Sequence, residues 1–231
     1  MKNKIIFIAC DTSNVKEVKN IINRTKTKKL KIIPKFGLQF FYSRDGRKFL
    51  KNFNSDLFLD IKASDIGTTI SSALYSLKDI KKIKYITVMA SVGLKSLKLF
   101  NKQAKKINKN LMVLGVTVLT SLDDKSLKEI GYKDKVEKIV LKQAGLLKQA
   151  GIKGIVASGR EAKIIKKKYK DLFIVTPGIR LPGDKSNDQS RITTPIDAFN
   201  EKVSAIVIGR SLTKGNIQKN LEKLISHLNI K

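Results

Sequence analysis

The chain has 231 residues, 42% of them hydrophobic, which suits one large domain with a sizeable core. Lys and Arg outnumber Asp and Glu by 48 to 19, so the formal net charge is +29. The longest apolar stretch, LMVLGVTVLT (111–120), is about half of the roughly 20 residues that span a bilayer. The N-terminal segment is too short and too soon acidic for a signal peptide. We therefore expect a soluble, cytoplasmic protein with no membrane partner.

The high positive charge could indicate nucleic-acid binding, because clustered Lys and Arg neutralise phosphates and release counterions. The lysines are instead spread over nearly every helical segment, and arginine, the better ligand for bases and phosphates, occurs at only seven positions. This distribution favours solvated helix faces, with nonspecific polyanion binding at low salt as a side effect. We expect no specific nucleic-acid partner.

Two residue counts exclude further classes of site. Cys10 is the only cysteine, so an internal disulfide is impossible, and its place in the first predicted strand favours a small core residue over a nucleophile. His227 is the only histidine, which argues against a Ser-His-Asp triad and against a histidine-based zinc site.

Short apolar runs alternate along the chain with segments of helical periodicity. Eight strands are predicted, at 5–11, 30–37, 57–62, 85–90, 111–120, 154–158, 172–178 and 205–210. Helical segments include VKEVKNIINR (15–24), TISSALYSLKDI (69–80), VEKIVLKQAGLLKQAG (136–151) and IQKNLEKLISHLN (217–229). Eight strands rich in Ile, Val and Leu, each followed by a helix, predict a single-domain (β/α)8 barrel over residues 1–231. A doubly wound sheet is the alternative, but it would need fewer strands or a second domain.

Charged residues stand at or just beyond the ends of three predicted strands, as Asp11, Lys35, Asp60, Lys62 and Asp65. Asp60 and Lys62 are two residues apart and so share one face of a strand. Buried charges are costly unless paired, which leaves a structural ion pair or chemistry as the explanation. In a (β/α)8 barrel the carboxyl ends of the strands form the active site, so we favour chemistry.

Other strand ends are also polar, and each has a structural alternative. Thr120 could cap a helix beginning near Asp123, and Asp11, which precedes TSN, could likewise be a helix cap. Gly209 and Arg210 could form an ordinary strand-end turn. The segment 180–191 has the composition of either a disordered connection or a mobile lid.

The chain resembles the orotidine 5'-phosphate decarboxylase family over essentially its whole length. The matching segments, in order, are IACD, IPKFGLQFF, LDIKASDIGTT, GVTVLTS, VTPGIR, NDQSRITTP and AIVIGRSL. The Asp-x-Lys-x-x-Asp core is shared with related barrels, whereas TPGIR, DQ-x-R and IGRS make the match specific. The family usually has histidine where this chain has Met89, and Pro-Asn where it has Gly67 and Thr68.

The resemblance implies decarboxylation of orotidine 5'-phosphate to UMP without a cofactor or metal, the last step of pyrimidine synthesis. Lys62 would stabilise the carbanion at C6 and then protonate it. Asp60 would hold Lys62 charged and crowd the substrate carboxylate, and Lys35 would pair with Asp60 and a ribose hydroxyl. Asp11 would accept hydrogen bonds from the ribose.

The resemblance also implies contacts to the rest of the substrate and between subunits. Asp65 and Thr69 would reach into the neighbouring subunit's site, so that a homodimer would be needed for catalysis. At the phosphate, Gly209 would allow close backbone approach and Arg210 would supply a guanidinium. The segment 180–191 would close over the phosphate as a lid. The remaining predicted ligands are Arg180 and Gln189 at the phosphate and Thr120 at the pyrimidine.

Two other functions remain open from the sequence. A metal-dependent sugar-phosphate lyase is suggested by DIG (65–67) in place of DIP, but it would need further carboxylates at strand ends, and strands four to eight supply none. A basic nucleic-acid-binding protein without catalysis would be expected to show interleaved aromatics for base stacking, which the sequence lacks.

Overall fold

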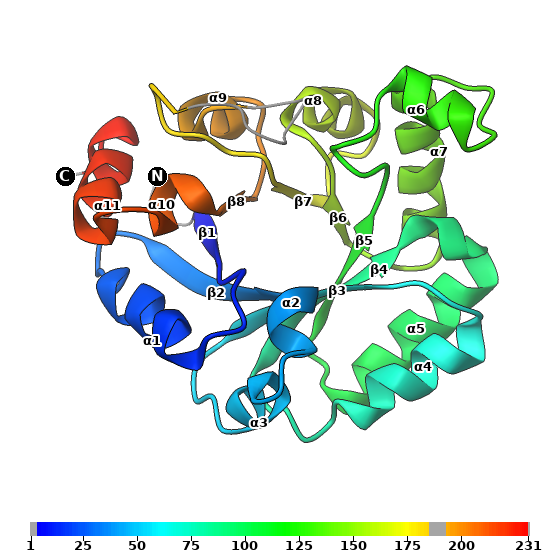
Figure 1. The fold of residues 1–231 in the computed structure, drawn as a ribbon. Coiled ribbons are helices and arrows are strands. Elements are labelled where there is room, and N and C mark those ends of the chain that lie inside the picture. The colour runs from blue at the N-terminus through cyan, green and yellow to red at the C-terminus, as the bar shows by residue number, and fades with distance from the viewer. Residues whose placement is uncertain (1–3, 185–192, 231) are drawn as a thin grey trace.

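The computed structural model describes residues 4–184 and 193–230, and it folds as a closed barrel of eight parallel strands (Figure 1). Each strand pairs with its sequence neighbours, and β8 closes the ring against β1. The strands are β1 (Ile5–Ala9), β2 (Lys31–Gly37), β3 (Leu57–Ala63), β4 (Ile83–Met89), β5 (Met112–Val116), β6 (Gly154–Val156), β7 (Phe173–Thr176) and β8 (Ala205–Ile208). The predicted fold class is thereby confirmed.

Helices surround the barrel and connect successive strands (Figure 1). They are α1 (Val15–Arg24), α2 (Leu38–Phe41), α3 (Gly46–Lys51), α4 (Gly67–Ser76), the 3-10 turn η1 (Ala90–Val92), α5 (Gly93–Ile107), α6 (Asp124–Glu129), α7 (Val136–Gln149), α8 (Gly159–Lys168), α9 (Pro195–Asn200), α10 (Arg210–Thr213) and α11 (Ile217–His227). Among the described residues, no helix is long and apolar enough to cross a membrane.

The strands are buried on both faces, because alternate residues point into the barrel and out toward the helices. In β1 the inward set includes Phe7, which meets Phe58 of β3 and Tyr85 of β4 edge to face, with ring centroids 4.8 and 4.9 Å apart. The outward set, Ile6 and Ile8, belongs to the larger core between strands and helices. This double burial explains the near-continuous apolar runs in the sequence.

Helix boundaries follow local signals where those signals are strong. Helix α1 covers the predicted 15–24, and Asn14 caps it by accepting hydrogen bonds from the backbone N–H groups of Lys16 and Glu17. The prediction for the fifth strand was too long, because β5 ends at Val116 rather than at residue 120. The apolar residues after Val116 continue into a loop, where Val118 is buried without belonging to a strand.

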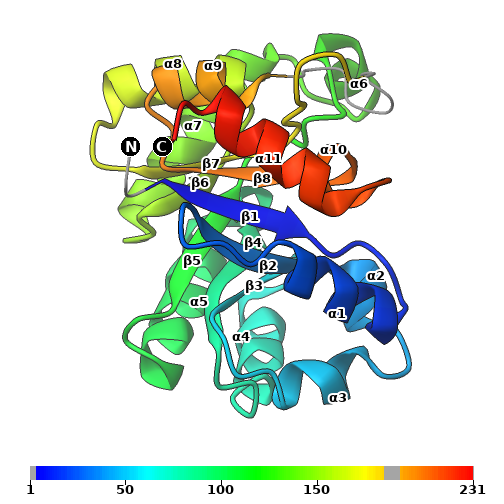
Figure 2. The same cartoon turned by 90° about the vertical axis from the view of Figure 1, so that its left-hand side faces the viewer.

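All eight strands point the same way, so their carboxyl ends gather at one end of the barrel. Figure 2 shows β1 pointing toward the end at which α10 lies. The polar residues predicted to form the site follow these strand ends.

Candidate active site

The inward-facing series of β1, β2 and β3 change from apolar to charged as the strands approach this end. On β1, Phe7 and Ala9 lead to Asp11; on β2, Ile33 leads to Lys35. On β3, Phe58 leads to Asp60 and then Lys62. The fold therefore places all four charges over the same apolar floor.

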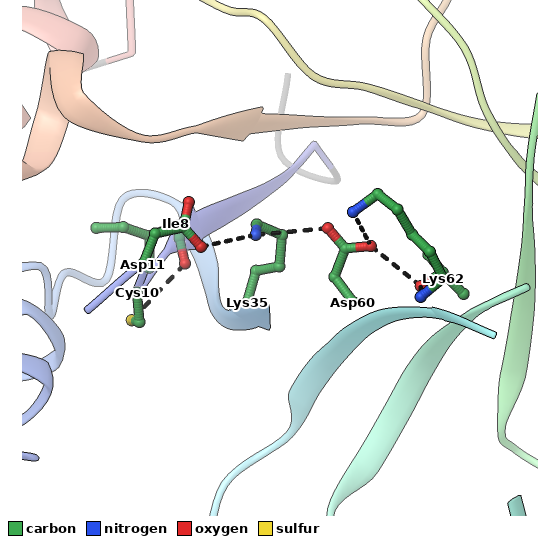
Figure 3. Close-up of polar contacts among 7 residues, drawn as sticks. Ile8, Cys10, Asp11, Lys35, Asp60 and Lys62 are labelled. Atoms are coloured by element: carbon green, nitrogen blue, oxygen red, sulfur yellow. Dashed lines mark hydrogen bonds and ion pairs between the residues drawn. The ribbon is translucent and has the colours of Figure 1, made fainter. Parts of the chain in front are cut away.

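These four side chains form one alternating row of charges, drawn in Figure 3. The Lys35 Nζ atom lies 3.2 Å from Asp11 Oδ1 and 3.5 Å from Asp60 Oδ2. The Lys62 Nζ atom lies 2.9 Å from Asp60 Oδ1. Lys35 and Asp60 are mostly buried, with side chains 8% and 14% exposed, whereas Lys62 is 35% exposed and can meet a ligand.

The row keeps its buried members ionised. Burial would raise the pKa of Asp60, but the charges of Lys35 and Lys62 and hydrogen bonds from Lys62 and Thr87 hold that pKa below its usual value. Burial would lower the pKa of Lys35, yet the carboxylates of Asp60 and Asp11 outweigh it and keep the pKa above its usual value. Asp60 and Lys35 are therefore both charged at neutral pH.

Lys62 has an unusual backbone, with φ at 47°, a left-handed conformation that is uncommon for lysine. The pairing of β3 with β4 is irregular just here, since its register shifts between Leu59 and Ala63. The sequence predicts that Asp60 and Lys62 meet because they share a face of a regular strand. They do meet, but on a distorted strand end.

Sequence reasoning missed Thr87, a fully buried residue of β4. Its hydroxyl accepts a hydrogen bond from the Lys62 backbone N–H at 2.8 Å and donates one to Asp60 Oδ1 at 3.0 Å. The available signal was its position two residues after the inward-facing Tyr85, a polar residue in the apolar run YITVM.

Gly37, the last residue of β2, was also missed as a site residue. A Cβ atom added there would lie 3.1 Å from Asp11 Oδ1 and 3.5 Å from Lys35 Nζ. Glycine thus leaves room for the Lys35–Asp11 ion pair.

The row borders a cavity of about 280 Å³ at the carboxyl ends of the strands. Apolar side chains such as Phe58, Val116 and Val207 form part of its wall. Eight of the predicted site residues line it, namely Asp11, Lys35, Asp60, Lys62, Thr120, Arg180, Gly209 and Arg210. Larger grooves lie between surface helices, for example one of about 930 Å³ beside α4 and α5, but the ion pair of Lys51 and Asp79 within it is solvent-exposed.

Two arginines stand on neighbouring strand ends of this cavity. Arg180 follows β7 and Arg210 begins α10 after β8. Burial and the charge of Arg210 lower the pKa of Arg180, so the two cations are close enough to repel each other. The Arg180 Nε atom is buried without a hydrogen-bond partner among the described residues. An anion bound between the two arginines would offset their repulsion and give Arg180 Nε a hydrogen-bond acceptor.

The structure decides two alternatives that the sequence left open. Asp11 does not cap α1, because Asn14 does, and Asp11 pairs with Lys35 instead. Thr120 is not the helix cap either, since Asp123 caps α6 through its side chain. The prediction that Thr120 ends a strand was wrong, because β5 stops at Val116, but Thr120 still lines the cavity from the loop after β5.

A Cβ atom added at Gly209 would meet Ala9 Cβ at 3.6 Å, an ordinary contact. Among the atoms of residues 4–184 and 193–230, none therefore requires glycine at this position. Close approach of a ligand remains the predicted reason for it.

Some predicted residues are not brought to the cavity of their own chain. Asp65 and Thr69 are exposed, and Asp65 accepts a hydrogen bond from the Ile66 backbone N–H at 2.6 Å. Asp65 borders a separate hollow with Ile66 and Leu99, both exposed. Met89 ends β4 half-buried and does not line the cavity. Gln189, with most of the predicted lid, lies outside the described residues.

Among residues 4–184 and 193–230, no group of three or more His, Cys, Asp or Glu side chains is placed to hold a metal ion. The carboxylates at the cavity, Asp11 and Asp60, are instead engaged by Lys35.

Residues 4–223 match the sequence pattern of the family described as "Orotidine 5'-phosphate decarboxylase / HUMPS family". The chain belongs to this family. It is 38% identical over 219 residues to an orotidine 5'-phosphate decarboxylase of Prochlorococcus marinus subsp. pastoris, covering 90% of each chain. It is 36% identical over 212 residues to the enzyme of that name from Staphylococcus epidermidis, again covering 90% of each.

Two solved structures share the fold of this chain. The crystal structure of orotidine 5'-phosphate decarboxylase from Lactobacillus acidophilus superposes with a TM-score of 0.81 at 27% identity, covering 98% of this chain and 99% of that one. A Methanocaldococcus jannaschii structure, described as orotidine 5'-monophosphate decarboxylase complexed with inhibitor BMP, has a TM-score of 0.76 at 21% identity and covers 99% of both chains. The latter likeness concerns the fold alone.

Proposed function

We propose that this chain decarboxylates orotidine 5'-phosphate to UMP and CO2, the last step of pyrimidine biosynthesis. The observation that carries the proposal is the row Asp11, Lys35, Asp60 and Lys62, whose most exposed ammonium opens into the cavity. Membership of the family and the relatives of that name support it.

In the reaction, the bond between C6 of the pyrimidine and its carboxylate breaks, and CO2 leaves without the electron pair. The pair stays on C6, where a neighbouring ammonium stabilises it. Lys62 Nζ donates a proton to C6 and recovers one from water. Asp60, 2.9 Å from that nitrogen, holds it in place and disfavours the substrate carboxylate by its own charge.

The ring order of the strands gives the substrate a direction. Arg180 and Arg210 follow β7 and β8, next to β1 and β2, which carry Asp11 and Lys35. The phosphate binds the two arginines, the ribose lies along Asp11 and Lys35, and the pyrimidine reaches Lys62 on β3. Thr120 contacts the pyrimidine from the far side of the ring of strands.

We further propose a cytoplasmic homodimer that needs no cofactor. Asp65 and Thr69 lie exposed on the loop after β3 and the first turn of α4, outside their own cavity. That position supports a role in the neighbouring subunit's site.

The direct test is the ultraviolet absorbance change of orotidine 5'-phosphate in the presence of a chelator. Conversion to UMP at an undiminished rate is expected. Activity that disappears with the chelator and returns with Mg²⁺ would favour a metal-dependent lyase, and binding of random DNA without any turnover would favour the nucleic-acid alternative.

A further inference from the structure

Thr87 bridges two parts of the charged row with a single hydroxyl group. Its Oγ1 atom is 2.8 Å from the Lys62 backbone nitrogen and 3.0 Å from Asp60 Oδ1. A hydroxyl has one proton to donate and lone pairs to accept, so it can make both bonds at once. Because an N–H group can only donate, the hydroxyl accepts from Lys62 and its proton goes to Asp60.

The first of these bonds compensates for the distorted backbone. At φ 47° Lys62 has left regular strand geometry, and the register of β3 against β4 shifts at this point. Such a conformation persists only where the surroundings enforce it. The Thr87 side chain supplies the acceptor for the Lys62 N–H, and this bond fixes the start of the lysine side chain.

The second bond fixes the carboxylate that holds the lysine's other end. Asp60 Oδ1 receives both the Thr87 hydroxyl and the Lys62 ammonium, while Oδ2 faces Lys35 at 3.5 Å. The Thr87 hydrogen bond is one of the causes that lower the pKa of Asp60. One buried hydroxyl therefore constrains the Lys62 backbone and its counter-ion together.

We propose that Thr87 is a positioning residue of the decarboxylase, which acts by holding Lys62 and Asp60 in their reactive arrangement without touching the substrate. The inference rests on the proposed function and deepens it. Thr87 is fully buried and does not line the cavity, in contrast to Asp60 and Lys62.

Three variants separate this role from simple packing. Thr87→Val keeps the shape of the side chain but removes the hydroxyl, and Thr87→Ser keeps the hydroxyl. Thr117→Val is the matched control, because Thr117 is equally buried and its hydroxyl donates to the Val156 backbone carbonyl at 3.0 Å, away from the charged row.

The measured quantities are kcat for orotidine 5'-phosphate and the Kd of UMP, which lacks the carboxylate. Loss of a hydrogen bond to a charged group predicts that Thr87→Val lowers kcat about tenfold to a hundredfold. The Kd of UMP should change less than about threefold, and Thr87→Ser and Thr117→Val should keep kcat within about threefold of the parent.

A Thr87→Val variant with the kcat of the parent would overturn the inference. So would equal losses of kcat in Thr87→Val and Thr117→Val, since both would then reflect general destabilisation. A parent protein that leaves orotidine 5'-phosphate unchanged would instead refute the proposed function, and the inference with it.

Amide hydrogen exchange in the unsubstituted protein tests the bridge even if Thr87→Val does not fold. The Lys62 amide should exchange slowly compared with that of the exposed Ser64. Equally fast exchange at both positions would mean that Thr87 does not hold the Lys62 backbone.

Discussion

The ammonium group of Lys35 lies in the interior between two carboxylates. This position explains both the energetic cost of burying the charge and the role of Lys35 in the site. A buried charge without partners is strongly destabilising, whereas the pairs with Asp60 and Asp11 compensate for its lost hydration. Because these contacts also fix Asp60, the stability of the row and the placement of Lys62 are linked. The charged residues proposed to act in decarboxylation are therefore also the ones whose ion pairs stabilise the fold.

The pKa shifts predict how this stability depends on pH. The pKa of Asp60 is lowered, so its contribution is present above its ordinary value of 3.8 and is lost as the pH falls through the folded-state pKa. The pKa of Lys35 is raised, so its contribution is present below 10.5 and is lost as the pH rises through the folded-state pKa.

We expect Lys35→Met to lower the free energy of unfolding by about 3 to 5 kcal/mol at neutral pH, because it leaves Asp60 with one partner fewer. Urea unfolding across a pH series measures the difference in free energy of unfolding between Lys35→Met and the parent. This difference should become smaller at both low and high pH. A difference of constant size would show that Lys35 stabilises the protein only through the packing of its aliphatic chain.

Replacing Lys62 by alanine should nearly abolish decarboxylation, since a positioned general acid typically contributes about 10²- to 10⁴-fold. The fold should remain, as judged by circular dichroism, because Asp60 keeps Lys35 and Thr87 as partners. The exposed Lys98, changed to alanine, is the control. Retention of even about a tenth of the parental kcat by Lys62→Ala would refute its assignment as the proton donor.

At the scale of elements, α4 approaches α5 closely because its first residue is Gly67. A Cβ atom added there would lie 2.9 Å from Leu99 Cδ1 and 3.0 Å from Ser96 Cα. The start of α4 is therefore packed more tightly than a proline ring at this position would permit. The glycine thus affects where the helix after Asp65 begins.

Gly67→Ala should therefore destabilise the protein by about 1 kcal/mol, since the clash with the Ser96 backbone outweighs the better helix propensity of alanine. Thr68→Ala, one residue further along and exposed, should change stability by less than about 0.5 kcal/mol. Urea unfolding measures both. An increase in stability on Gly67→Ala would mean that α4 can move away from α5 without cost.

The short helix α10 carries Arg210 at its first position, next to Gly209. If Arg210 binds the phosphate, Arg210→Ala should lower kcat/KM for orotidine 5'-phosphate by about 1.5 to 3 kcal/mol and barely affect orotidine, which lacks the phosphate. Gln189→Ala should have a smaller effect of the same kind. Arg24→Ala, at the end of α1, removes a surface hydrogen bond to Gln218 and serves as the control.

Equal losses on the phosphorylated and unphosphorylated substrates would contradict this assignment. Arg210 would then support the barrel itself, and the phosphate site would have to lie elsewhere.

At the scale of the whole molecule, the barrel holds the charged row but leaves Asp65 and Thr69 outside it. If they complete the neighbouring subunit's site, an Asp65→Ala chain and a Lys62→Ala chain should be inactive alone. Mixed and re-equilibrated, they should recover about a quarter of the parental activity, because half of the dimers are mixed and each has one intact site. Mixtures as inactive as either parent would place the function of Asp65 within its own chain.

Much of the architecture follows from local properties of the sequence. Eight apolar runs alternating with helical periodicity predict the barrel, and α1 begins and ends where its amphipathic pattern indicates. The same pattern identifies Asp11, Lys35, Asp60 and Lys62, because charges at the end of apolar strands are rare enough to be informative. Thr120, Arg180 and Arg210 also stood at or near strand ends in the sequence, and the family resemblance supplied their predicted roles at the substrate.

Only the tertiary structure decided what depends on contacts between strands. The role of Thr87 depends on the pairing that places β4 against β3, where its hydroxyl reaches the Lys62 backbone. The left-handed backbone of Lys62 has no local sequence signal. Val116 ends β5 because pairing with β6 stops there, although the apolar run continues. Local patterns determine which segments form strands and helices, whereas register, strand distortion and shared hydrogen bonds arise between segments far apart in the chain.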